Sequence, residues 1–165
     1  MKHVINLPGG GWDLKRYFQY LAEVEKQLPL EVFAFASDPR NYDIESHQSL
    51  HDAWLECLSI TEPAAGMRSE VRNIRIDCRF LGPYHDLDIH ITYFDVAEYS
   101  LTNPAGFLTP PTVAVGHGDL LMHEVRRDDG GGAIVHELLF SRGSVFKITC
   151  ATFYHRVEAR HVVRD

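Results

Sequence analysis

Two segments near the middle of the chain alternate strictly between apolar and polar residues, and this period of two limits the possible folds more than any other feature. In residues 70–81 the apolar positions are Ile74, Ile76, Cys78 and Phe80. In residues 86–96 they are Leu87, Ile89, Ile91 and Tyr93. Such alternation is typical of strands with one buried and one solvated face, so we predict two strands joined by a tight turn at GPYH, residues 82–85.

The same composition, β-branched and aromatic residues between turn clusters, recurs through the second part of the chain. It predicts further strands at residues 52–61, 97–102, 119–127, 133–141 and 145–157. The segment TNPAGFLTPPT, residues 102–112, is rich in Pro and Gly and is predicted as a loop within the domain. Strands joined by short turns pair antiparallel, so we expect a large sheet of consecutive hairpins that could close toward a barrel or a sandwich.

The N-terminal part has a different period. Between residues 12 and 29, apolar side chains recur every three or four positions, which predicts a helix that Pro29 ends. Residues 30–37, LEVFAFAS, fit a short buried helix or a strand, and we favour the helix. The chain is therefore predicted as a single α+β domain, 1–165, with a helical part at 1–48 packed on an antiparallel sheet at 49–165.

Composition excludes several classes of protein. The chain has 165 residues and a formal net charge of −7, which argues against binding to nucleic acid because phosphates require clustered Lys and Arg. Its three cysteines, Cys57, Cys78 and Cys150, form no CxxC motif and are odd in number, which favours a reducing compartment. No signal-peptide pattern or membrane-spanning apolar run is present in the sequence, so we expect a cytoplasmic protein without membrane contact.

The hexapeptide HDLDIH, residues 85–90, concentrates histidine and aspartate as a metal site would. The register that keeps both apolar sets on one face places Arg79 opposite Asp88 and Asp77 opposite His90. Cross-strand pairs of this kind are common in sheets, so we interpret the segment as a solvated strand face. A ligand role would need a second layer of structure over that face.

Three residues on later strands form a possible metal site. A two-residue turn at Asp129–Gly130 would place His123 opposite His136, and a three-residue turn at 142–144 would place His136 opposite Cys150. Imidazole and thiolate groups in one row across three strands could hold zinc and leave a position open for water.

Asp119 is expected on the same strand face as His123, because an even number of positions separates the two residues. The alternative is that the histidines are hydrogen-bonded core residues and that the cysteine is a small buried hydrophobe. No HExxH or paired-cysteine motif supports the metal, so no cofactor is predicted and zinc stays the alternative.

His51, Asp52 and His117 are the candidates for acid–base catalysis. A His–Asp pair can bind metal or move protons, but at the start of a strand it can equally hydrogen-bond to neighbouring backbone. His117, in GHGDLL, could lie near His51 in space. No nucleophile motif, dinucleotide motif or P-loop supports a more specific chemistry.

Four segments carry a resemblance to known proteins: SLHDAWLECLSI, IHITYFDVAEYSL, GDLLMHEVRR and VHELLFSRGSVFKITCATFYH. Together they resemble a family of small uncharacterised bacterial proteins and are similar to immunity-protein-like domains of bacterial toxin systems. The matching positions are His51, Asp52, Ala53, Phe94, Asp119 and Glu124. The resemblance spans about residues 49–155 and implies an interaction protein of the immunity type, without any particular activity.

Two functions are therefore open. The first is a non-enzymatic binding protein whose acidic surface covers a basic protein partner. The second is a small metal-dependent hydrolase built on His123, His136 and Cys150. A homodimer formed through an exposed sheet edge is compatible with either.

Overall fold

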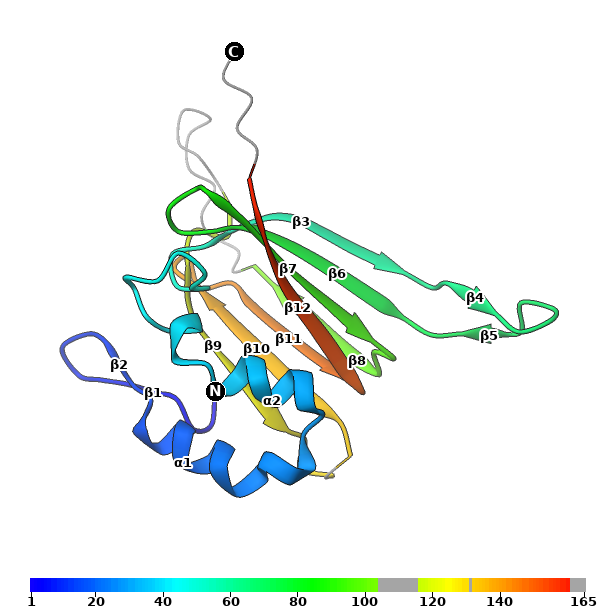
Figure 1. Ribbon diagram of the computed structural model, residues 1–165, viewed down its shortest axis with the longest axis horizontal. Coiled ribbons are helices and arrows are strands. Elements are labelled where there is room, and N and C mark those ends of the chain that lie inside the picture. The colour runs from blue at the N-terminus through cyan, green and yellow to red at the C-terminus, as the bar shows by residue number, and fades with distance from the viewer. Residues whose placement is uncertain (104–115, 131, 161–165) are drawn as a thin grey trace, which may run out of the picture.

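The computed structural model describes residues 1–103, 116–130 and 132–160 (Figure 1). The predicted α+β class is confirmed, because two α-helices pack against two four-stranded antiparallel sheets, and the described strands form no closed barrel. The first sheet has the order β12–β7–β6–β3 and consists of β3 (Trp54–Thr61), β6 (Arg75–Leu81), β7 (Leu87–Phe94) and β12 (Thr152–Ala159). The second has the order β8–β11–β10–β9 and consists of β8 (Glu98–Thr102), β9 (Leu120–Arg127), β10 (Ile134–Phe140) and β11 (Val145–Cys150).

The two sheets share one bent ribbon. Strand β7 continues through a corner into β8, and β11 continues through Ala151 into β12, so each pair of strands runs from one sheet into the other. At the corner, Ala97 N donates to Thr149 O at 2.8 Å and Ala151 N donates to Phe94 O at 3.2 Å. The single strand predicted at 145–157 is therefore wrong, since it is two strands in different sheets.

The helices pack against the sheets. Helix α1 spans Lys15–Val24 and α2 spans Leu30–Ser37, with 3₁₀ turns at Glu25–Gln27 and Pro39–Asn41. Helix α2 is in contact with β12, and α1 is in contact with α2. The helix favoured at 30–37 is confirmed. The helix predicted at 12–29 is shorter, because Trp12–Asp13 form β2, which pairs with β1 (Ile5–Asn6). Side chains from α1, α2 and both sheets belong to one apolar core.

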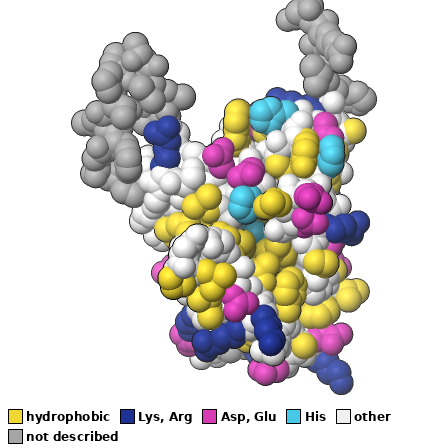
Figure 2. Space-filling model, turned by 90° about the vertical axis from the view of Figure 1, so that its left-hand side faces the viewer, with side chains coloured by type: hydrophobic (Ala, Val, Ile, Leu, Met, Phe, Trp, Pro, Cys, Tyr) yellow, Lys and Arg dark blue, Asp and Glu magenta, His cyan; other side chains and the backbone are white. Residues whose placement is uncertain are grey.

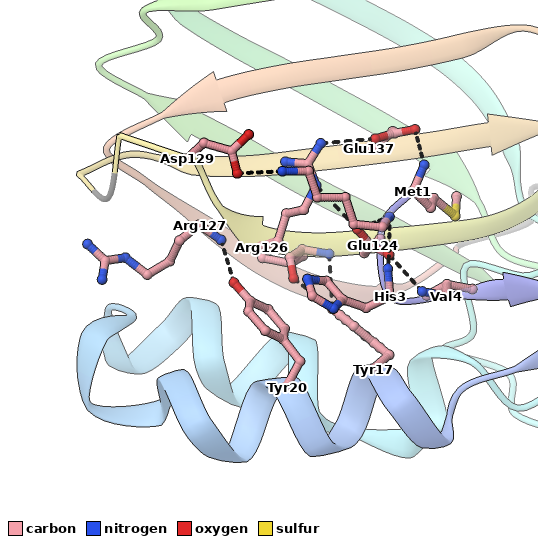
Figure 3. A network of polar contacts seen from close by, with 12 residues as sticks. Met1, His3, Val4, Tyr17, Tyr20, Glu124, Arg126, Arg127, Asp129 and Glu137 are labelled. Atoms are coloured by element: carbon pink, nitrogen blue, oxygen red, sulfur yellow. Dashed lines mark hydrogen bonds and ion pairs between the residues drawn. The ribbon is translucent and has the colours of Figure 1, made fainter.

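Two tyrosines of α1 cover the free edge of β9. The hydroxyl of Tyr17 accepts a hydrogen bond from Val125 N at 2.9 Å and lies 3.1 Å from Val125 O, to which it donates. One turn later, the hydroxyl of Tyr20 accepts from Arg127 N at 2.8 Å (Figure 3). These hydroxyls take the place of a neighbouring strand and so satisfy an edge that would otherwise be open to pairing with another chain.

A buried carboxylate holds the first residues of the chain on the outer face of the second sheet (Figure 3). Glu124 is fully buried and accepts hydrogen bonds from the backbone nitrogens of Lys2, His3 and Val4 at 2.7 to 3.0 Å. Its other charged neighbour is Arg126, whose Nε lies 3.2 Å away. Burial of a carboxylate is costly unless it is paired and hydrogen-bonded, and both conditions are met here.

Directly opposite Glu124 on β10 lies Glu137. Its carboxylate is 2.6 Å from the Met1 amino group and 3.3 Å from a guanidinium nitrogen of Arg126. Like charges opposite each other on neighbouring strands destabilise a sheet, and the cations beside this pair compensate for that. We call residues 1–4, held in this way, the N-terminal strap.

A two-stranded arm extends beyond the body of the molecule, to the right in Figure 1. It consists of β4 (Ala64–Ala65) and β5 (Val71–Arg72), which prolong β3 and β6. No described core residue lies between 62 and 73, and Met67 at its tip is fully exposed. The strand predicted at 70–81 is thus divided into β5 and β6.

The predicted strand faces are confirmed, but the predicted registers are wrong by two residues. Phe80 faces Ile89 rather than Leu87, and Arg79 faces His90 rather than Asp88. In the second sheet, His136 faces Val125 and Ile148, not His123 and Cys150. The faces themselves are unchanged, because a shift of two residues leaves each side chain on its own face.

The remaining expectations concern the surface. Within the residues that the structure describes, no helix is long and apolar enough to cross a membrane. The loop predicted at 102–112 lies outside the described residues except at its first two positions. In Figure 2, basic side chains gather toward the lower end of the molecule, where α1 lies in Figure 1, and histidines lie in the upper half.

Candidate functional site

A cleft lies where β3 and β9 begin, at the end of the sandwich that also carries the β10–β11 turn. Its volume is about 480 Å³. The lining residues come from three segments that are distant in sequence: Trp54, Leu55, Gly116, His117, Gly118, Asp119, Ser141 and Arg142. Two residues predicted separately, His117 as a catalytic candidate and Asp119 as a metal candidate, are brought together here.

Backbone hydrogen bonds fix these three segments to one another. Leu120 N donates to Ala53 O at 2.9 Å and Asp52 N donates to Leu120 O at 2.8 Å, which joins the starts of β3 and β9. Ser141 N donates to Asp119 O at 2.8 Å, and Ser141 Oγ accepts from Asp119 N at 3.0 Å. The walls of the cleft therefore belong to the same rigid framework as the sheets.

Only glycine fits at position 118. Its φ of +78° lies in the left-handed region, and a Cβ there would meet Ser141 Oγ at 2.2 Å. This close approach lets the segment before β9 reach the β10–β11 turn.

The indole of Trp54 forms one wall and is held in place by two contacts. Its Nε1 donates to Asp119 Oδ1 at 2.6 Å, and the ring of His85 meets it edge-on with centroids 4.6 Å apart. The side chain remains 46% exposed. Because the indole N–H is already bonded, Trp54 offers the cleft an apolar aromatic surface.

Arg142 and Asp119 supply the charges of the cleft. Within the described part of the chain, the guanidinium of Arg142 has no hydrogen-bond or ion-pair partner. Asp119 uses one oxygen for Trp54, which leaves the second available as an acceptor. The cleft thus carries one positive and one negative group.

The tautomer of His117 follows from its neighbours. Ser144 Oγ donates to Asn103 Oδ1 at 3.2 Å, so toward His117 Nδ1, at 2.9 Å, this hydroxyl can only accept. Nδ1 therefore carries the proton and Nε2 is the acceptor. Burial lowers the pKa of His117, which keeps its imidazole neutral at neutral pH.

His51 and Asp52 precede the cleft but do not line it. Their Nδ1 and Oδ1 atoms are 3.1 Å apart, yet His51 Nδ1 makes no aligned hydrogen bond. Asp52 has a φ of 64° and binds Leu120 through its backbone nitrogen. The predicted alternative is that these side chains hydrogen-bond to neighbouring backbone; among the described residues, the backbone nitrogen of Asp52 makes such a bond and the two side chains do not.

His123 and His136 lie in the core rather than in a cleft. His136 Nε2 is 3.2 Å from His123 Nδ1, and His136 Nδ1 is 2.8 Å from the hydroxyl of Tyr93. The ring of Phe35 packs against both histidines, with centroids 5.3 and 5.7 Å away. Burial lowers the pKa of His123 to about 3 and the pKa of His136 well below 6.5, so both imidazoles are neutral.

Cys150 does not complete a row with these histidines. It lies opposite Ile134, two residues away from His136, and burial raises the pKa of its thiol to about 12. Across residues 1–103, 116–130 and 132–160, no three His, Cys, Asp or Glu side chains are placed to hold a metal ion together. The expected register of the row is therefore wrong.

The HDLDIH segment lies on the exposed face of the first sheet. His85 is in the turn with a φ of 61°, and Asp86 pairs with His47 at 2.6 Å. Asp88 is 3.3 Å from a guanidinium nitrogen of Arg160, and His90 is 3.4 Å from Glu158. These partners differ from the predicted ones, but the side chains lie on a solvated strand face as expected.

Sequence reasoning missed three residues of interest. Trp54 and Arg142 were not singled out, because nothing local in the sequence shows that their segments meet. His155 is a third histidine of the cluster around Phe35 and is partly buried; the two rings lie 4.8 Å apart, and desolvation lowers the pKa of His155 to about 4. Apolar residues of the segment 145–157 occupy mainly even-numbered positions up to Cys150 and mainly odd-numbered positions from Phe153 on. This change in the alternation could have placed His155 on the inner face.

Comparisons with protein families and with curated proteins identify no relative of this chain. No protein-family model matches the chain, and no curated protein matches it significantly. The resemblance to immunity-protein-like domains therefore stays a prediction.

Proposed function

We propose that this protein is a non-enzymatic binding protein that recognises a protein partner through the outer face of the first sheet. The observation that carries the proposal is a hollowed outer face on which arginine and aromatic side chains gather. Its hollow of about 360 Å³ is lined by side chains from all four strands, among them Arg75, Arg79, Phe94, Tyr154 and Arg156. We call these five residues the recognition face.

The residue types on this face are those that dominate protein interfaces. Arginine and aromatic side chains are enriched among the residues that contribute most to binding energy. Tyr154 is 51% exposed and meets Phe94 edge-on, with centroids 5.5 Å apart. Arg75 lies over the other side of this cluster, 5.4 Å from the centre of the Phe94 ring.

Ion pairs within the face hold the arginines in place. Arg75 is 2.7 Å from Asp77, and Arg156 is 3.1 Å from Glu158. Exposed pairs of this kind contribute little to stability, but they restrict side chains that would otherwise lose entropy on binding. The negative net charge of the whole chain would favour a basic partner, but the three arginines of the recognition face favour a partner surface that carries acidic groups.

The alternative, a metal-dependent hydrolase at His123 and His136, receives less support. Both imidazoles are buried and bonded to each other and to Tyr93, which leaves a substrate no path to them. Within the binding class, the resemblance to immunity-protein-like domains makes a toxin enzyme the first partner to test. We also propose a cytoplasmic location, because all three cysteines are free and Cys57 is exposed.

A photo-crosslinking amino acid at position 154 tests the proposal in cells that make the protein. We expect one defined polypeptide to be labelled from position 154, and the label to disappear when Arg79→Glu and Arg156→Glu are combined. Position 99 is the matched control, because Tyr99 is a comparably exposed tyrosine on the other sheet. Equal labelling from both positions, or labelling that survives the charge reversal, would overturn the proposal.

A further inference from the structure

We propose that the cleft at the starts of β3 and β9 is a second binding site, which takes a neutral saccharide with one pyranose ring stacked on Trp54. The inference goes beyond the protein-binding face and does not depend on it. It stands on an aromatic wall, a balanced set of polar groups and a rigid frame.

The aromatic wall is pre-oriented. Trp54 is fixed by its bond to Asp119 and by the edge of His85, and yet nearly half of its side chain is exposed. A pyranose ring presents C–H groups on one face, and these pack on the electron-rich face of an indole. Because the Trp54 N–H is already used, stacking is the contact that the indole has left to offer.

The polar groups select for hydroxyls. Asp119 offers a free acceptor oxygen, Arg142 offers unpartnered donors, and His117 offers Nε2 as an acceptor. A sugar hydroxyl both donates and accepts, so it can satisfy all three. The one positive and one negative charge cancel, so the cleft holds no excess charge that would favour phosphate, carboxylate or ammonium ligands.

The size and rigidity of the cleft also suit such a ligand. Its volume of about 480 Å³ lies within the range of small-molecule pockets. Three segments are pinned to one another by backbone hydrogen bonds, so little ordering is needed when a ligand binds. At positions 116 and 118, glycines add no side chain to the cleft wall.

The experiment uses Trp54 fluorescence in the full chain. Trp12→Phe removes the only other tryptophan, so the signal then comes from the cleft alone. The protein is titrated separately with maltose, cellobiose, lactose and diacetylchitobiose. We expect a saturable change with at least one of them, with a dissociation constant on the order of 1 mM or below.

Two variants assign the binding to the polar groups. Asp119→Asn keeps an acceptor for Trp54 but loses the carboxylate, and Arg142→Gln loses the guanidinium; each should weaken binding about tenfold. Asp95→Asn, at the far end of β7, is the matched control and should bind as the parent does.

Three results would overturn the saccharide proposal. They are no saturable response from a folded protein, unchanged affinity in both cleft variants, or displacement of the sugar by equimolar inorganic phosphate. Photo-crosslinking from position 154 is measured on the same preparations. Loss of sugar binding with intact labelling would then reject this site without touching the proposed protein-binding function.

Discussion

At the scale of single residues, the most unusual feature is a group of three histidines, two buried and one partly buried, around one phenylalanine. His123, His136 and His155 all contact the ring of Phe35. Each is kept neutral by burial, which lowers its pKa. They therefore act as neutral polar residues of the interior, and they should lower the free energy of unfolding when the pH falls.

The stability of the fold should fall steeply below neutral pH. In the folded state the pKa of His123 is about 3 and that of His155 about 4, against an ordinary value of 6.5 for a histidine. The unfolded chain therefore binds more protons, and the stability is complete above pH 6.5 and is lost as the pH falls. By about pH 5 each of these two should lower the free energy of unfolding by roughly 2 kcal/mol.

Urea titrations followed by circular dichroism at neutral pH and near pH 5 measure this loss. His155→Gln should remove roughly 2 kcal/mol of the difference between the two pH values. Tyr154→Phe, at the exposed neighbouring position of β12, is the control, because it leaves every histidine in place and should leave the difference unchanged. A parent protein that is equally stable at both pH values would contradict the buried histidine cluster.

Faces could be predicted from the sequence residue by residue, whereas registers could not. Alternation with a period of two is unchanged when one strand is shifted by two positions, so both registers bury the same side chains. The turns decide between them: Gly143 has a φ of 82°, and Asp128 accepts from the nitrogens of Gly132 and Ala133. These local features are specific to each turn, and the pattern of apolar residues does not indicate them.

At the scale of elements, the N-terminal strap shows how a segment without regular structure is held. Residues 2–4 donate three backbone nitrogens to one buried carboxylate, Glu124, and β9 and β10 supply the remaining charges. The strap therefore depends on a few charged hydrogen bonds rather than on apolar area.

Replacing Glu124 by Gln should destabilise the protein by about 3 kcal/mol, because Arg126 then loses its buried partner and three backbone bonds weaken. Thermal and urea unfolding measure this. Glu137→Gln is the matched substitution on the neighbouring strand and should cost clearly less, since that side chain is 18% exposed. Equal losses from the two variants would show that burial does not set the strength of this network.

Element types were predicted better than element ends. The helix at 30–37 was identified from its apolar composition, but a continuous strand at 145–157 was not separated at Ala151. The corner there is set by pairing with Ala97 and Phe94, which lie some fifty residues away in the chain. Contacts of this range are not visible in a local pattern.

At the scale of the whole molecule, the β4–β5 arm adds length without adding to the core. Replacing residues 63–72 by Asn-Gly should therefore change the free energy of unfolding by less than about 1 kcal/mol. Urea unfolding is the measurement. A larger loss would mean that the arm supports β3 and β6, and would contradict its separation from the core.

The candidate cleft was predicted only in part. His117 and Asp119 were singled out by residue type, and both line it. Trp54 and Arg142 were not, because their roles arise only when the starts of β3 and β9 meet at the β10–β11 turn. A cleft assembled from three distant segments is a property of the tertiary structure.

The bent ribbon affects how the two sheets unfold. Because β7 runs into β8 and β11 runs into β12, separating the two sheets would require breaking hydrogen bonds within both at once. We therefore expect that neither sheet unfolds alone and leaves the other as a folded intermediate. Denaturation should then be a cooperative, all-or-none event, although the molecule is built from two layers.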